Sequence, residues 1–155
     1  MPEWRFKLQT LALYAGMALV LYAPNLPTFS TASIGHHQGN GHKHVRGLWS
    51  GMESIAENGY VSSEVKLINY PDGGTLFSLE QGSQWLGMIF RPFMNVVAIH
   101  NILYILNTLL AAFAAMLLAR EFTGSREGGV IAGAIYGFAP TALAFPIFSG
   151  VTETA

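Results

Sequence analysis

Residues 92–150 read PFMNVVAIHNILYILNTLLAAFAAMLLAREFTGSREGGVIAGAIYGFAPTALAFPIFSG, and this stretch decides the fold. It contains two long runs without Asp, Glu, Lys or Arg, separated by a short charged segment. About 20 apolar residues in a helix cross a hydrocarbon core of roughly 30 Å, and lipid offers the backbone no other hydrogen-bond partner. We therefore predict transmembrane helices at about 94–119 and 128–149, joined by the polar turn 120–127.

Each of these two predicted helices carries small residues at every fourth position. They are Ala111, Ala115 and Ala119 on the first helix, and Gly129, Gly133 and Gly137 on the second. Such faces let two helix backbones approach closely, which favours association in lipid. We expect the alanine face to pack against the glycine face, although glycine and alanine are also simply common in membrane helices.

The composition of the whole chain is that of a membrane protein. Its 155 residues are 51% hydrophobic and 11% charged, whereas soluble domains carry about 25% charged residues. The chain has no cysteine, which excludes disulfides and thiolate chemistry. Its net charge of -1 comes without a basic stripe, so nucleic acid is not an expected partner.

A third apolar segment lies near the N-terminus, after a short head that contains Arg5 and Lys7. A cleaved signal peptide has a similar basic start, but Pro24 and Pro27 stand where small cleavage-site residues belong. We predict an uncleaved helix at about 8–29, which makes the chain an all-α membrane protein with three spans.

The basic residues predict how these spans are oriented. Arg5 and Lys7 precede the first span, and Arg120 and Arg126 lie in the 120–127 turn. Positive flanks stay cytoplasmic, so the N-terminus and the turn are expected there and the 30–91 loop on the outer side. We expect residues 1–155 to form a single N-terminal membrane module of a longer multi-pass protein, with further transmembrane helices as its partners.

The 30–91 loop contains two predicted short helices. Apolar residues recur at helical spacing over about 45–58, with Trp49 among them, which predicts an amphipathic helix on the membrane surface. A helix that covers another part of the protein is the alternative. Residues 76–90 predict a second interfacial helix, with Trp85 as its anchor, after a turn at 70–74 that contains Pro71 and two glycines.

Two groups of polar residues in this loop are candidates for chemistry. Four imidazoles, which are ligands for zinc, copper or nickel, lie close together in the sequence at His36, His37, His42 and His44. Glu53 and Glu57 are one helical turn apart, so they are placed to share a divalent cation or to supply a general base. The alternatives are that the histidines belong to a solvated loop and that the glutamates form the solvent-exposed face of an amphipathic helix.

Three polar residues, His100, Asn101 and Asn107, fall inside the predicted 94–119 span. Polar side chains at membrane depth face the bundle interior and bond across helices. We expect Asn101 and Asn107 to point away from lipid, and His100 to lie near the outer end of the span.

Taken in order, these motifs resemble bacterial multi-pass membrane proteins of the GT-C glycosyltransferase type. The similarity covers most of the chain and is greatest from Tyr70 onward. The matching segments are Leu48-Trp49, YPDGGTL at 70–76, His100-Asn101, LLAREFTGSR at 117–126 and AGAIYGFAP at 132–140.

The resemblance implies an integral protein of the bacterial cytoplasmic membrane that takes a polyprenyl-phosphate-linked sugar donor. Transfer then occurs at the outer face to a lipid, glycan or protein, with a divalent cation as candidate cofactor. The family places an acidic residue in the first outer loop, but residues 35–42 of this chain contain none. Asn40 or His42 stands near that position, and Glu53 or Glu57 are the candidates to replace the missing acid.

Two other functions remain open at this point. A non-catalytic membrane scaffold or polysaccharide-export partner would keep the helices and lose the acid. A metal-binding membrane protein would instead use the four histidines.

Overall fold

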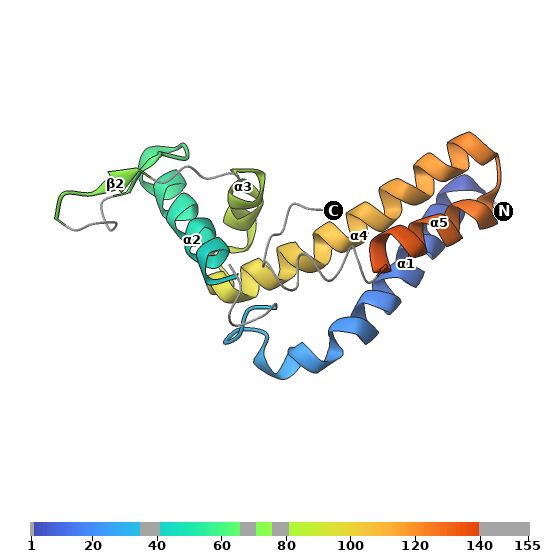
Figure 1. Ribbon diagram of the computed structural model, residues 1–155, viewed down its shortest axis with the longest axis horizontal. Coiled ribbons are helices and arrows are strands. Elements are labelled where there is room, and N and C mark those ends of the chain that lie inside the picture. Colours follow the sequence, from blue (N-terminus) through green and yellow to red (C-terminus); the bar gives the residue numbers. More distant parts are fainter. Residues whose placement is uncertain (1, 35–40, 66–70, 76–80, 140–155) are drawn as a thin grey trace.

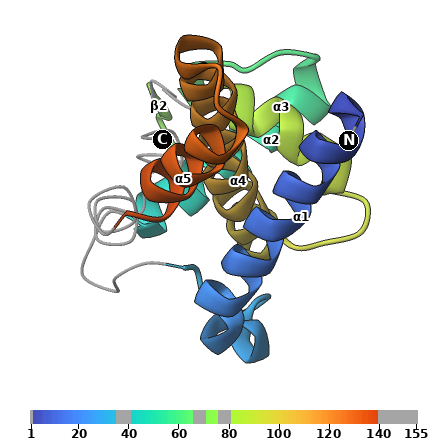
Figure 2. The ribbon, with the colours of Figure 1, turned by 90° about the vertical axis from the view of Figure 1, so that its right-hand side faces the viewer.

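The chain is mostly helical in the computed structural model, which describes residues 2–34, 41–65, 71–75 and 81–139. The elements in chain order are α1 (Glu3–Tyr22), the 3-10 helix η1 (Ala23–Thr28), α2 (Gly41–Asn58), β1 (Glu64–Val65), β2 (Gly74–Thr75), α3 (Gln81–Phe90), α4 (Val96–Thr123) and α5 (Arg126–Phe138). Figure 1 shows α2 and α3 at one end of α4, and α1 and α5 along the rest of it. The view in Figure 2 places α4 between α1 and α5.

Helix α4 is the element on which the others pack, and its ends are set by local sequence. Asn95 caps its start, because the side-chain Oδ1 accepts the Ala98 N–H at 2.9 Å. Gly124 ends it with a φ of 66°, a left-handed conformation that glycine adopts without steric cost. Ser125 then caps α5 by accepting the Gly128 N–H at 3.0 Å. The predicted hairpin is therefore present, and its turn is shorter than the polar segment 120–127.

Two helical segments are long and apolar enough to cross a membrane, counting only the described part of the chain. The first is α1 continued by η1, where the sequence predicted a span at about 8–29. The second is α4, where it predicted 94–119. The third predicted span, 128–149, is described only as α5 to Phe138, and its remaining part lies outside the described residues.

The seam between α4 and α5 confirms one predicted small-residue face and corrects the other. Gly129, Gly133 and Gly137 are all buried there. They pack against Ala112 and Met116 of α4, and not against the predicted alanines. A shift of one residue turns a helix by about 100°. The predicted alanine row, Ala111, Ala115 and Ala119, accordingly lines an open apolar groove beside the seam.

Helix α1 is joined to the hairpin by two tyrosines. The Tyr14 hydroxyl donates a hydrogen bond to the Val130 carbonyl of α5 at 2.8 Å, and its side chain is fully buried. The Tyr22 and Thr108 hydroxyls lie 3.3 Å apart between α1 and α4. Because both contacts are long-range, they fix how α1 lies along the hairpin.

The α2–α3 unit, defined as these two helices and the short β1–β2 ladder, packs on the first turns of α4. Leu48 and Met52 of α2 meet Ile99 and Leu103 of α4 in one buried cluster. The predicted helix at 45–58 is present, begins earlier at Gly41, and buries its apolar face against the protein. The second predicted helix is α3, which begins at Gln81, and residues 76–80 lie outside the described chain. The antiparallel ladder of β1 and β2 was not predicted.

Candidate functional site

The three acid or base candidates, His42, Glu53 and Glu57, all lie on α2. His42 is exposed in the first turn of the helix, and Glu57 is exposed near its end. Glu53 follows His42 by eleven positions, which corresponds to about 16 Å of helix at 1.5 Å per residue. Glu53 and Glu57 remain one turn apart, so a small group reaches both of them but does not reach His42 as well.

Glu53 already has a partner at the end of the neighbouring helix. Arg91, which directly follows α3, donates from Nη2 to the Glu53 Oε2 at 2.7 Å. The side chains are 36% and 38% exposed. This ion pair ties the end of α3 to α2 and leaves Glu57 as the exposed carboxylate of the two.

The four-histidine hypothesis is only partly covered by the structure. His36 and His37 lie outside the described residues, while His42 and His44 fall in the first turns of α2. Within the described ranges, no three side chains of the types His, Cys, Asp and Glu gather closely enough to hold a metal ion.

Beneath the α2–α3 unit, a buried asparagine connects α4 to the segment that follows η1. Asn101 is fully buried, and its Oδ1 accepts the Ile34 N–H at 2.7 Å. Its Nδ2 donates to the carbonyls of Phe29 at 2.8 Å and Ala32 at 2.9 Å. Asn101 therefore points into the protein interior, as predicted, and His100 beside it is also fully buried. Asn107, which was predicted to face inward as well, is only partly buried.

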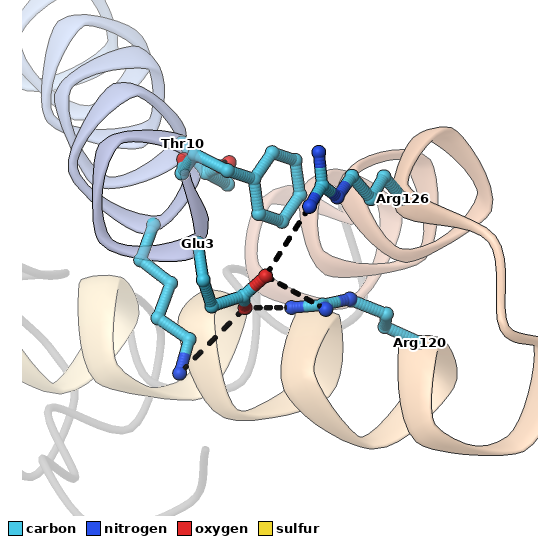
Figure 3. Close-up of polar contacts among 6 residues, drawn as sticks. Glu3, Thr10, Arg120 and Arg126 are labelled. Carbon is cyan, nitrogen blue, oxygen red and sulfur yellow. Dashed lines mark hydrogen bonds and ion pairs between the residues drawn. The ribbon is translucent and has the colours of Figure 1, made fainter. Parts of the chain in front are cut away.

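At the opposite end of α4, charged residues from three helices meet in a cluster. From the sequence, Lys7, Arg120 and Arg126 predicted only the orientation of the spans, and Glu3 was not singled out. We call Glu3, Phe6, Lys7, Arg120 and Arg126 the basic cluster. Both Glu3 oxygens accept hydrogen bonds from Arg120, one of them at 2.9 Å. Figure 3 shows Arg120 and Arg126 both directed at the Glu3 carboxylate.

The other two cations of the basic cluster lie further from that carboxylate. Arg126 Nη2 is 3.5 Å from the Glu3 Oε2, and Lys7 Nζ is 3.8 Å from its Oε1. The carbon centres of the Arg120 and Arg126 guanidinium groups lie 5.4 and 5.3 Å from the centroid of the Phe6 ring. Glu3 is the only acidic residue before Glu53 in the sequence, and this was the one signal of such a contact.

The described residues therefore form a helical protein in which two segments are long and apolar enough to span a membrane. Comparison of the chain with known protein families, with curated proteins and with solved structures finds no match.

Proposed function

We propose that this chain is the N-terminal membrane module of a GT-C-like glycosyltransferase, which uses a polyprenyl-phosphate-linked sugar donor at the outer membrane face. The observation that supports this most directly is the position of the α2–α3 unit. It packs on the first turns of α4, while the basic cluster lies at the other end of that helix. Since positive flanks stay cytoplasmic, the α2–α3 unit is then at the outer surface of a bacterial cytoplasmic membrane.

In this proposal Glu57 performs the acid–base or cation-binding role. A carboxylate at the membrane surface serves as general base, or holds a cation beside the donor phosphate. Glu57 is exposed, whereas Glu53 is engaged by Arg91. His42, about four helical turns from Glu57 on α2, would contact a different part of the donor.

The test is transfer of labelled sugar from a broad panel of polyprenyl-phosphate donors by the full-length gene product in membranes. Glu57→Gln should lower turnover at least tenfold without changing expression, because Gln cannot accept a proton. Glu127→Gln is the matched control, since Glu127 is an exposed helical glutamate at the opposite end of the molecule. Absence of turnover with every donor, or equal rates in both variants, would refute the catalytic role.

The second candidate is a non-catalytic membrane scaffold or polysaccharide-export partner. The observation in its favour is the Glu53–Arg91 pair, which gives one of the two candidate carboxylates a structural use. Under this alternative the sugar-transfer assay is negative and affinity-tagged protein retains a partner from membranes. The two candidates therefore give opposite results in the same preparation.

A further inference from the structure

We propose that the basic cluster binds the phosphate headgroup of an acidic phospholipid in the adjacent leaflet. The proposal depends on a membrane location for the chain but not on sugar transfer. Three cationic side chains, Lys7, Arg120 and Arg126, share the single carboxylate of Glu3, so the cluster carries a net positive charge. Basic pockets between transmembrane helices bind anionic lipid headgroups by this chemistry.

The distances indicate which side chains meet the lipid. Arg120 binds both oxygens of Glu3 and is held in place by this bidentate contact. Arg126 and Lys7 point to the same carboxylate from 3.5 and 3.8 Å and keep 39% and 44% of their side chains exposed. These two residues therefore present cationic surface to a second anion beside Glu3.

The guanidinium groups are positioned before any ligand arrives. The carbon centres of Arg120 and Arg126 lie 5.4 and 5.3 Å from the centroid of the Phe6 ring, within the range of cation–π attraction. Phe6 is itself 7% exposed, so its ring is a fixed platform. Side chains already ordered in this way lose less conformational entropy when an anion binds.

Two exposed aromatic residues at this end favour a lipid over a soluble phosphate. Trp4 is 59% exposed, and tryptophan is enriched where a helix leaves the bilayer. Phe122, which is 82% exposed, adds apolar surface beside it. Glu121 in the last turn of α4 and Glu127 in the first turn of α5 reduce the positive field. With Arg5 included, the basic side chains at this end still outnumber the acidic ones among the described residues.

Native mass spectrometry of the purified chain in neutral micelles, titrated with phosphatidylglycerol or phosphatidylcholine, tests the proposal. We expect tighter binding of phosphatidylglycerol, and about a fivefold loss of that affinity in either Lys7→Gln or Arg126→Gln. Arg46→Gln, an exposed basic residue of α2, is the matched control and should change nothing. Equal affinity for both lipids, or equal effects of all three variants, would overturn the proposal.

Glu3→Gln distinguishes a lipid-binding role of the basic cluster from a role limited to holding α1, α4 and α5 together. Removing this carboxylate raises the positive charge, so affinity for phosphatidylglycerol should rise about fivefold. A loss of affinity in Glu3→Gln would overturn the proposal. The melting temperature of each variant in neutral micelles identifies any that fail to fold, and the exposed Lys7→Gln then provides the decisive measurement.

Inorganic phosphate and glycerol phosphate form the soluble arm of the experiment. Neither should displace phosphatidylglycerol at millimolar concentration if the lipid is the ligand. Displacement by either compound would reassign the cluster to a soluble anion. Sugar transfer is not measured in any arm, so failure here leaves the proposed enzymatic function unaffected.

Discussion

The α4–α5 seam and the α2–α3 unit are both closely packed. In the seam one helix backbone contacts the other, whereas in the α2–α3 unit a side chain packs against a helix backbone. At the seam, a Cβ added to Gly133 would lie 2.5 Å from the Ala112 carbonyl oxygen, so helix backbones are in contact. In the α2–α3 unit, a Cβ added to Gly51 would meet the amide group at the end of the Gln84 side chain. Backbone cannot move aside as a flexible side chain can, so the two regions should differ in their tolerance of one added methyl group.

The largest effect is expected from Gly133→Ala. The new methyl would clash with the Ala112 carbonyl, the Met116 Cβ at 2.9 Å and the Tyr14 hydroxyl. Overpacking of this kind costs about 3 kcal/mol, at the upper end of its usual range. Unfolding in mixed micelles with increasing SDS measures the loss.

Gly16→Ala is the matched control, since a Cβ at Gly16 would have nothing within 4 Å. It should be neutral, or stabilise the helix by up to about 1 kcal/mol. If the two variants unfold together, close backbone contact does not hold α4 to α5.

Asn101→Ala should have the next largest effect. The substitution removes one acceptor and two donors, and leaves the Ile34 N–H and two carbonyl oxygens without this partner. The expected loss is about 2 kcal/mol, because each unsatisfied buried group costs about 1–3 kcal/mol and the carbonyls are partly accessible. Asn58→Ala, at an exposed position, should unfold like the unmodified chain.

Gly133 and Asn101 also show which parts of the fold can be predicted from the sequence. Periodicity and the lack of charge were enough for the helices, because lipid leaves a long apolar segment no other regular structure. They also predicted the glycine face and the inward direction of Asn101. The glycines pack against Ala112 and Met116, each one position after a predicted alanine, Ala111 or Ala115. The rotation of a helix about its axis depends on packing, which residue spacing alone does not determine.

The polar regions were less predictable than the helices. Nothing in the sequence pairs Glu53 with Arg91, and the isolated acid at Glu3 does not identify Arg120 as its partner, since both pairs are long-range contacts made by the fold. Helical spacing did place Glu53 and Glu57 together, and it equally separates His42 from them. Candidate residues on one predicted helix could therefore be grouped, whereas contacts between elements could not.

Gly51→Ala tests the side-chain half of the comparison and should cost about 1 kcal/mol. Gln84 would have to leave its position, where its Nε2 donates to the Gly47 carbonyl at 3.0 Å, and a neutral hydrogen bond contributes about 1 kcal/mol. Gly47→Ala meets nothing within 4 Å and is the control. A loss from Gly51→Ala as large as that from Gly133→Ala would remove the proposed difference between the two regions.

The smallest effect on stability should come from the Glu53–Arg91 pair, and it bears on function. Because the two side chains are 38% and 36% exposed, breaking the pair with Glu53→Arg or Arg91→Glu should cost at most about 1 kcal/mol. The double charge swap should recover most of this loss in the same unfolding assay. A swap that restores stability and turnover assigns Glu53 a structural role and leaves the chemistry to Glu57. A swap that restores stability but abolishes turnover means that the carboxylate itself is needed at position 53.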